Sequence, residues 1–267
     1  MLYYIHLEGD TMSIDEFLNA EIEEMHDVDL DRAFYILDRI PDEYNKAYYI
    51  HPTYDMEPSI DKAINKFKVY GSSEIIELLD KESRDEVLYR EQEEIPIAYN
   101  TEFVKDSKNN IMALLTYPRV LDDVSYVFFG HEFHHVLKDS HRNEIKLKNR
   151  FAEVIPMFYE FMSADREEDI DISKEILNRR MNLLALDKNY YKASIKGKLQ
   201  YFNSFYYSLC LYNKYKSNPV LVLRLISRVL IGEITTLDLL NILNIYDNDL
   251  NNVVDDELYK VKEYIHN

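Results

Sequence analysis

Helix-breaking residues are scarce along this chain, because only 5 Gly and 7 Pro stand among 267 residues. With 46% hydrophobic residues, the chain is too ordered in composition for a disordered tail and long enough to bury a substantial core. Segments with helical spacing of apolar residues follow one another. Several of them begin at Ser, Asp or Thr, whose side chains accept hydrogen bonds from the free amides of a first helical turn. The sequence therefore predicts a mainly α fold in a single domain.

The expected helices cover residues 13–25, 29–40, 59–70, 73–94, 218–232, 236–243 and 255–265. One region departs from this pattern. In residues 95–117, the turn-rich stretch from Asp106 to Asn110 separates two short runs that contain Ile, Tyr, Phe, Val and Leu. These runs predict an antiparallel hairpin, and hence a small sheet directly before a histidine-rich segment.

The charge balance disfavours several classes of partner. The chain has 31 basic and 49 acidic residues, a net charge of −18, so its field should repel nucleic acid and anionic membranes. No apolar run reaches the roughly 18 to 20 residues of a membrane span. The single cysteine, Cys210, cannot form an intramolecular disulfide, and charges interrupt the N-terminal stretch where a signal peptide would be apolar. We therefore expect a cytoplasmic protein.

The stretch VFFGHEFHHVLKDSH contains the strongest chemical signal. Steps of three and four place on one helix face Leu121, Val124, Phe128, His131 and His135. An apolar stripe on this face thus ends at His131 and His135. These two imidazoles lie one helical turn apart and can hold one ion, and imidazole nitrogens favour zinc. Glu132 is rotated by about 100° from His131, beside the metal and free to take a proton from water.

A third ligand is needed, and Glu153 lies 22 positions after His131. Apolar residues recur at helical spacing in residues 147–162, which predicts a second amphipathic helix that returns antiparallel and presents Glu153 to the ion. Pro156 removes an amide that would bond to the carbonyl of Ala152, so a kink is expected beside Glu153.

Other ligand sets stay open. His141, ten positions after His131, has the spacing of the metzincin pattern, although Lys138 stands where that pattern needs Gly. His134 could replace His135 as a ligand, but a site formed by His131 and His134 would be rotated away from the apolar face of the helix. We therefore expect His134 to support a ligand or to line the cleft wall. Glu144 is interpreted as a loop or first-turn charge.

The segments LDDVSYVFFGHEFHHVL and RFAEVIPMFYEF together resemble the catalytic segment of the thimet oligopeptidase and oligoendopeptidase F family of zinc peptidases. The similarity extends loosely from about Tyr70 to about Tyr246. The resemblance implies one zincin-like domain, with N-terminal helices in residues 1–69, a family-like catalytic core in 70–246 and a C-terminal helix in 247–267. It also implies three Zn²⁺ ligands, which are His131, His135 and Glu153.

Glu132 is then the general base, and Tyr201 is the candidate for stabilising the oxyanion, with Tyr206 and Tyr207 as alternatives. The expected function is zinc-dependent hydrolysis of peptide bonds in short peptides. Two alternatives stay open: a catalytically degenerate module that binds zinc or another protein, and a zinc hydrolase acting on a non-peptide amide.

Overall fold

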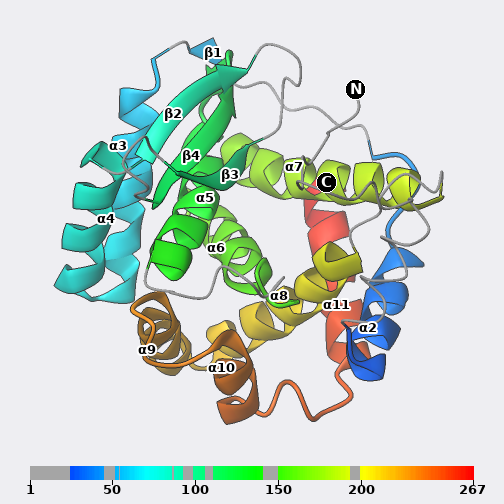
Figure 1. The fold of residues 1–267 in the computed structure, drawn as a ribbon. Coiled ribbons are helices and arrows are strands. Elements are labelled where there is room, and N and C mark those ends of the chain that lie inside the picture. The colour runs from blue at the N-terminus through cyan, green and yellow to red at the C-terminus, as the bar shows by residue number, and fades with distance from the viewer. Residues whose placement is uncertain are drawn as a thin grey trace, which may run out of the picture.

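The computed structural model describes residues 25–44, 52–53, 55–85, 87–92, 99–105, 111–140, 150–192 and 199–267, and these are mainly helical, as predicted (Figure 1). The helices are α2 (Asp27–Leu37), α3 (Glu57–Lys66), the 3-10 helix η1 (Phe67–Tyr70), α4 (Ser73–Asp85), α5 (Ser125–Ser140), α6 (Val154–Asp165), α7 (Ile170–Lys192), α8 (Leu199–Ser217), α9 (Pro219–Leu230), α10 (Thr236–Ile242) and α11 (Asn251–His266). The strands are β1 (Pro52–Thr53), β2 (Val87–Gln92), β3 (Asn100–Lys105), β4 (Ile111–Pro118) and β5 (Leu121–Asp122). The helix expected in residues 13–25 lies outside the described residues.

The main sheet has the strand order β2-β4-β3 and lies at one end of the helical body, beside α4 and α5 (Figure 1). Strands β3 and β4 pair antiparallel, with Val104 opposite Met112, so the strand pairing of the predicted hairpin is confirmed. The turn predicted between them lies outside the described residues. The Tyr99 ring, next to β3, stacks on Phe128 of α5 at a centroid distance of 5.6 Å. This contact joins the sheet to the helix that carries the histidines.

The prediction of one helix over residues 73–94 is wrong. Helix α4 ends at Asp85, and β2 follows as a strand parallel to β4, with Tyr89 opposite Leu115. The sheet is therefore mixed, whereas only an antiparallel hairpin was predicted. Val87 is buried and Leu88 is 46% exposed, which is the two-residue alternation of a strand. Pairing with β4 outweighs the helical tendency of the charged residues around this short apolar run.

Helix α5 begins later than the apolar stripe indicated. Leu121 lies in β5 and Val124 precedes the helix, which begins at Ser125. The Asp122 carboxylate accepts hydrogen bonds from the Val124 amide at 3.2 Å and from the Ser125 hydroxyl at 3.0 Å. These bonds satisfy donors at the start of α5 and turn the chain from strand to helix.

Helix α6 occupies the centre of the core and packs against α5, α7 and α8. Every residue from Val154 to Ala164 is buried, so α6 is not the one-sided amphipathic helix predicted for residues 147–162. A helix that is apolar on all sides is stable only inside a core. Its single interior charge, Glu160, is 1% exposed and has to be compensated by neighbouring residues.

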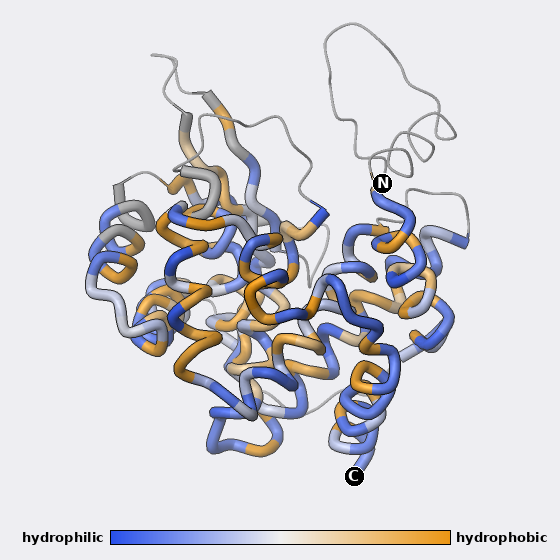
Figure 2. The backbone as a smooth tube through the Cα atoms, turned by 90° about the horizontal axis from the view of Figure 1, so that it is seen from below, coloured by the Kyte–Doolittle hydropathy of each residue, from blue (hydrophilic) through white to orange (hydrophobic). Residues whose placement is uncertain are grey.

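The peripheral helices follow the predicted pattern more closely. Polar and apolar residues alternate along them in Figure 2, as expected for helices with one face on the core. Helix α9, predicted as a buried amphipathic helix, begins after Asn218, whose side chain accepts a hydrogen bond from the Leu221 amide. Thr235 and Asp238 form a reciprocal capping box at the start of α10. None of the helices in the described part of the chain has the length and apolarity to cross a membrane.

Candidate metal centre

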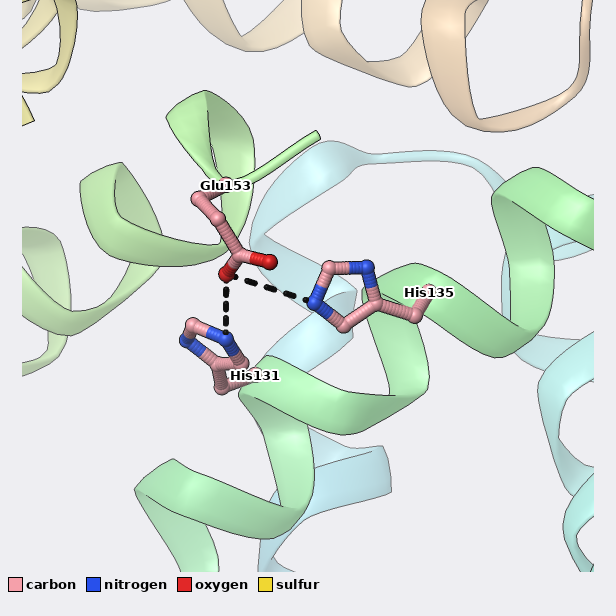
Figure 3. Close-up of side chains that lie close together, drawn as sticks. All are labelled: His131, His135 and Glu153. Atoms are coloured by element: carbon pink, nitrogen blue, oxygen red, sulfur yellow. Dashed lines mark hydrogen bonds and ion pairs between the residues drawn. The ribbon is translucent and has the colours of Figure 1, made fainter. Parts of the chain in front are cut away.

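The two histidines of α5 and the glutamate before α6 converge on one point (Figure 3). His131 and His135 lie one turn apart on α5, and Glu153 directly precedes α6. The Glu153 Oε2 atom is 3.0 Å from Nε2 of His131 and 3.5 Å from Nε2 of His135. Potential ligand atoms of all three residues lie within 4.8 Å of one another. The structure thus brings together the three residues predicted as ligands.

A glycine allows α6 to approach α5 at this point. Gly130 immediately precedes His131, and a Cβ atom at this position would lie 2.5 Å from the ring and hydroxyl of Tyr159. Tyr159 belongs to α6 and is fully buried, so it has little freedom to move away. The absence of a side chain at Gly130 therefore lets α6 pack directly on the turn of α5 that carries the first histidine.

The position of Glu153 depends on the turn formed by residues 150–153. Two side chains of α8 hold it: Asn203 donates to the Arg150 carbonyl at 3.2 Å, and Ser208 donates to the Val154 carbonyl at 2.8 Å. Glu153 has helical backbone angles, yet its side chain does not cap α6. Its carboxylate points instead toward the two histidines (Figure 3).

The kink predicted at Pro156 does not arise, because Glu153 lies outside the helix. Since α6 begins at Val154, Pro156 is its third residue. Amides in the first turn of a helix have no intrahelical partner, so the missing amide of Pro156 removes no helical hydrogen bond. The first such bond here runs from the Met157 amide to the Glu153 carbonyl at 2.9 Å.

The second nitrogen of His131 is held from the opposite side by a carboxylate and a guanidinium. Nδ1 of His131 lies 2.7 Å from Oε1 of Glu160. Arg180 of α7 donates hydrogen bonds to both oxygens of Glu160. Its Nε atom donates to Oε2 at 2.6 Å, and its NH2 group donates to Oε1. The Arg180 guanidinium holds the pKa of Glu160 below its usual range despite burial, which by itself would raise this pKa. An ionised Glu160 can only accept, so Nδ1 of His131 carries the proton.

The proton on Nδ1 of His131 determines whether the other ring nitrogen can bind a cation. With a proton on Nδ1, Nε2 of His131 is the atom that binds either a second proton or a metal ion, and it lies 3.0 Å from Oε2 of Glu153. Burial lowers the pKa of His131, but hydrogen bonds to Glu153 and Glu160 outweigh burial and raise it to about 10. A metal ion between these groups would take the place of the second proton. Ligands of a tetrahedral zinc ion lie about 3.3 Å apart, close to the 3.0 and 3.5 Å that separate Glu153 from the two histidines.

Two further predicted residues lie near this point. Glu132 is 6% exposed and follows His131 on α5. Tyr201, near the start of α8, is half-buried. Burial raises the pKa of Tyr201 well above its usual value, and the negative charges of Glu153, Asp187 and Glu132 add to this effect. Tyr201 is therefore within electrostatic range of both a candidate ligand and the candidate base.

The alternative tyrosines point elsewhere. Tyr206 donates to the Asn251 side chain at 3.1 Å, and Tyr207 donates to Asp29 of α2 at 3.1 Å. Both hydroxyls thus contact parts of the chain distant from the histidines in sequence. Of the three candidate tyrosines, Tyr201 is the one whose pKa responds to the charge of Glu153.

His134 packs into an aromatic cluster. It is 1% exposed, and its Nδ1 lies 2.6 Å from the Gly130 carbonyl, so Nδ1 donates. Its Nε2 then accepts from the Tyr70 hydroxyl at 2.8 Å, and its ring lies 4.5 Å from that of Phe67. His134 thereby joins η1 to α5 and is absent from the group of convergent ligand atoms. His141 and Glu144, the other open candidates, lie outside the described residues.

Sequence reasoning missed Glu160 and Arg180, which orient His131. One signal was available: Glu160 is a single charge within the apolar run from Val154 to Ala164, and such a charge needs a buried partner. No comparable signal marks Arg180, which follows another arginine on α7.

Comparison with protein-family models, with curated proteins and with solved structures found no match for this chain.

Proposed function

We propose that this protein is a zinc-dependent peptidase that hydrolyses peptide bonds, most readily those of short peptides. His131, His135 and Glu153 would hold the ion, Glu132 would act as general base and Tyr201 would stabilise the oxyanion. The resemblance to the oligopeptidase family, noted on residues 121–137 and 150–161, supports the peptide as substrate.

One observation carries the proposal: the buried charges around His131 do not balance. Glu132, Glu153 and Glu160 are 6%, 6% and 1% exposed, and the permanent cation that the described residues place beside them is Arg180. When His131 gives up its second proton, three carboxylates and one guanidinium leave two negative charges among the described residues of this buried region, which is costly without a counter-ion. A divalent cation between the imidazoles and Glu153 would neutralise them. Two imidazoles and one carboxylate make a donor set that suits zinc.

The ligand number favours catalysis over a purely structural role. Among the residues that the structure describes, no fourth His, Cys, Asp or Glu joins the three convergent groups. Structural zinc sites use four protein ligands, whereas catalytic sites use three and leave a position open. The alternative of a non-catalytic zinc module therefore requires a ligand from the rest of the chain, and His141 is the candidate to test.

Glu132 and Tyr201 would carry out the other catalytic roles. A bound zinc ion would supply Lewis acidity to water and to the scissile carbonyl. Glu132 accepts the proton of the attacking water and returns it to the leaving amine. The raised pKa of Tyr201 keeps its phenol protonated at neutral pH, so the hydroxyl can donate a hydrogen bond to the developing oxyanion.

The proposal is tested by measuring the zinc content of the purified protein together with cleavage of a peptide library. We expect about one zinc per chain, lost in His135→Ala and kept in His266→Ala, a control that removes an exposed histidine of α11. Glu132→Gln should keep zinc and lose roughly 10²- to 10⁴-fold in cleavage rate, the usual contribution of a general base.

The possible failures separate the parts of the proposal. Zinc without cleavage in the wild-type protein would favour the non-catalytic module. Full activity of Glu132→Gln would rule out its role as base. A wild-type protein that takes up no zinc on reconstitution would end the proposal altogether.

A further inference from the structure

Helix α2 packs on α8 (Figure 1). A second group of buried charges lies between these helices. Asp29 of α2 is fully buried and accepts hydrogen bonds from the hydroxyls of Tyr207 at 3.1 Å and Tyr246 at 3.4 Å. Its Oδ2 atom is also 3.3 Å from Nε of Arg150. We call Asp29, Arg32, Arg150, Tyr207 and Tyr246 the α2 anchor. None of these residues belongs to the convergent ligand group.

Arg32 completes the anchor from the same helix as Asp29. Its guanidinium donates to the Tyr207 hydroxyl at 2.7 Å and to the Asn248 carbonyl at 2.9 Å. It lies 5.2 Å from the ring centre of Tyr207 and 5.8 Å from that of Tyr246. Arg32 thus donates its hydrogen bonds to Tyr207 and Asn248, and the direct ionic partner of the Asp29 carboxylate is Arg150.

Arg150 links the anchor to the candidate metal centre, because it lies in the same turn as Glu153, three residues before it. Asn203 of α8 holds its carbonyl, and Asp29 of α2 holds its side chain. The next residue, Phe151, is 4% exposed and packs edge-on against the anchor ring of Tyr207 at 5.6 Å. The turn is therefore fixed on one side by α8 and on the other by α2.

A ligand outside a helix needs such support, because a binding site has to be held to within about 0.5 Å of its productive geometry. The two histidines obtain this rigidity from α5. Glu153 precedes α6, and its place depends on the contacts of the turn. We propose that Asp29 is a positioning residue for Glu153: through Arg150, it holds the turn in the conformation that completes the metal centre. This inference rests on the zinc site proposed above.

The test compares zinc affinity and apo-protein stability in matched variants of the full chain. Asp29→Asn keeps a hydrogen-bond acceptor for Tyr207 and removes the ionic partner of Arg150. Arg150→Gln breaks the same contact from the other side. Arg39→Gln is the control, because it removes another contact of this part of the chain, the 2.6 Å ion pair with Asp255 of α11, and touches neither Arg150 nor the turn.

Zinc dissociation constants are measured by competition with a chromogenic chelator, and thermal unfolding of each apo protein is followed separately. We expect Asp29→Asn and Arg150→Gln each to weaken zinc binding about tenfold, the lower end of the effect of residues that orient metal ligands. The double variant should be no weaker than either single variant, since both break one link. Arg150→Lys, which keeps the charge, should fall between wild type and Arg150→Gln, and it provides a milder variant if Asp29→Asn does not fold.

Wild-type zinc affinity in Asp29→Asn, or an equal loss in Arg39→Gln at equal apo stability, would overturn the positioning role and leave the zinc site intact. A wild-type protein without zinc affinity would instead overturn the zinc site, and this inference with it.

Discussion

The metal centre and the α2 anchor are both buried groups of charges, but they are balanced in opposite ways. In the anchor, one carboxylate, Asp29, pairs with the Arg150 guanidinium and accepts hydrogen bonds from two phenols, and Arg32 donates to one of these phenols. In the metal centre, three buried carboxylates accompany one buried guanidinium, that of Arg180. Protein groups pair with the charge of the anchor, whereas the described residues of the candidate centre lack two positive charges once His131 gives up its second proton. This deficit supports the proposed cation site, whereas the paired charges of the anchor hold helices together.

The largest effect on this comparison is expected from Arg180→Met, which removes the one guanidinium of the metal centre. Breaking one partner of a buried ion pair typically costs about 3–5 kcal/mol of stability. We expect Glu160 to take up a proton rather than stay buried and unpaired, so that His131 loses the ionised acceptor that orients it. Zinc affinity should then fall about 10- to 100-fold.

The neighbouring arginine offers a control for this variant. Arg179 is equally buried and pairs with Asp122 at 2.7 Å, away from His131. Arg179→Met should also destabilise the fold, as measured by chemical denaturation, yet leave the zinc dissociation constant unchanged. Equal losses of affinity in the two variants would show that the Glu160 contact has no special role.

The same two regions show how far the sequence could be interpreted. The candidate ligands were predictable because His131 and His135 obey helical spacing and Glu153 follows in a segment of recognisable pattern. Glu160 and Arg180 were missed because α6 is buried on all sides, so no polar face indicated where its one charge points. The contact between Asp29 and Arg150 joins residues 121 positions apart, and no local pattern encodes such a pairing. Strand β2 was missed because its partner β4 comes more than twenty residues later.

The pH dependence of stability probes the anchor. Burial raises the pKa of Asp29 from 3.8 to about 6, although the Tyr207 hydrogen bond and the Arg32 charge oppose the shift. Because the folded-state pKa is the higher one, Asp29 contributes stability below about pH 4 and loses that contribution as pH rises through about 6. At 1.36 kcal/mol per pKa unit, the change is on the order of 3 kcal/mol.

The measurement is the free energy of unfolding of wild type and Asp29→Asn from pH 4 to pH 7. Wild type should lose stability relative to the variant over this range, since the asparagine does not titrate. Parallel curves for the two proteins would mean that Arg32 and Arg150 neutralise Asp29 fully, and that the anchor is even better balanced than its geometry indicates.

The smallest effect is expected from Gly130→Ala, which tests the packing that brings α5 and α6 together at the metal centre. The added methyl would meet the buried Tyr159 ring at 2.5 Å. Overpacking of a core typically costs about 1–3 kcal/mol, and the better helix propensity of alanine returns up to about 1 kcal/mol. We expect a net loss of about 1–2 kcal/mol in chemical denaturation. Because Tyr159 causes the collision, Gly130→Ala should be neutral or stabilising in a Tyr159→Leu background. An equal loss of stability in both backgrounds would mean that Tyr159 does not require a glycine beside His131.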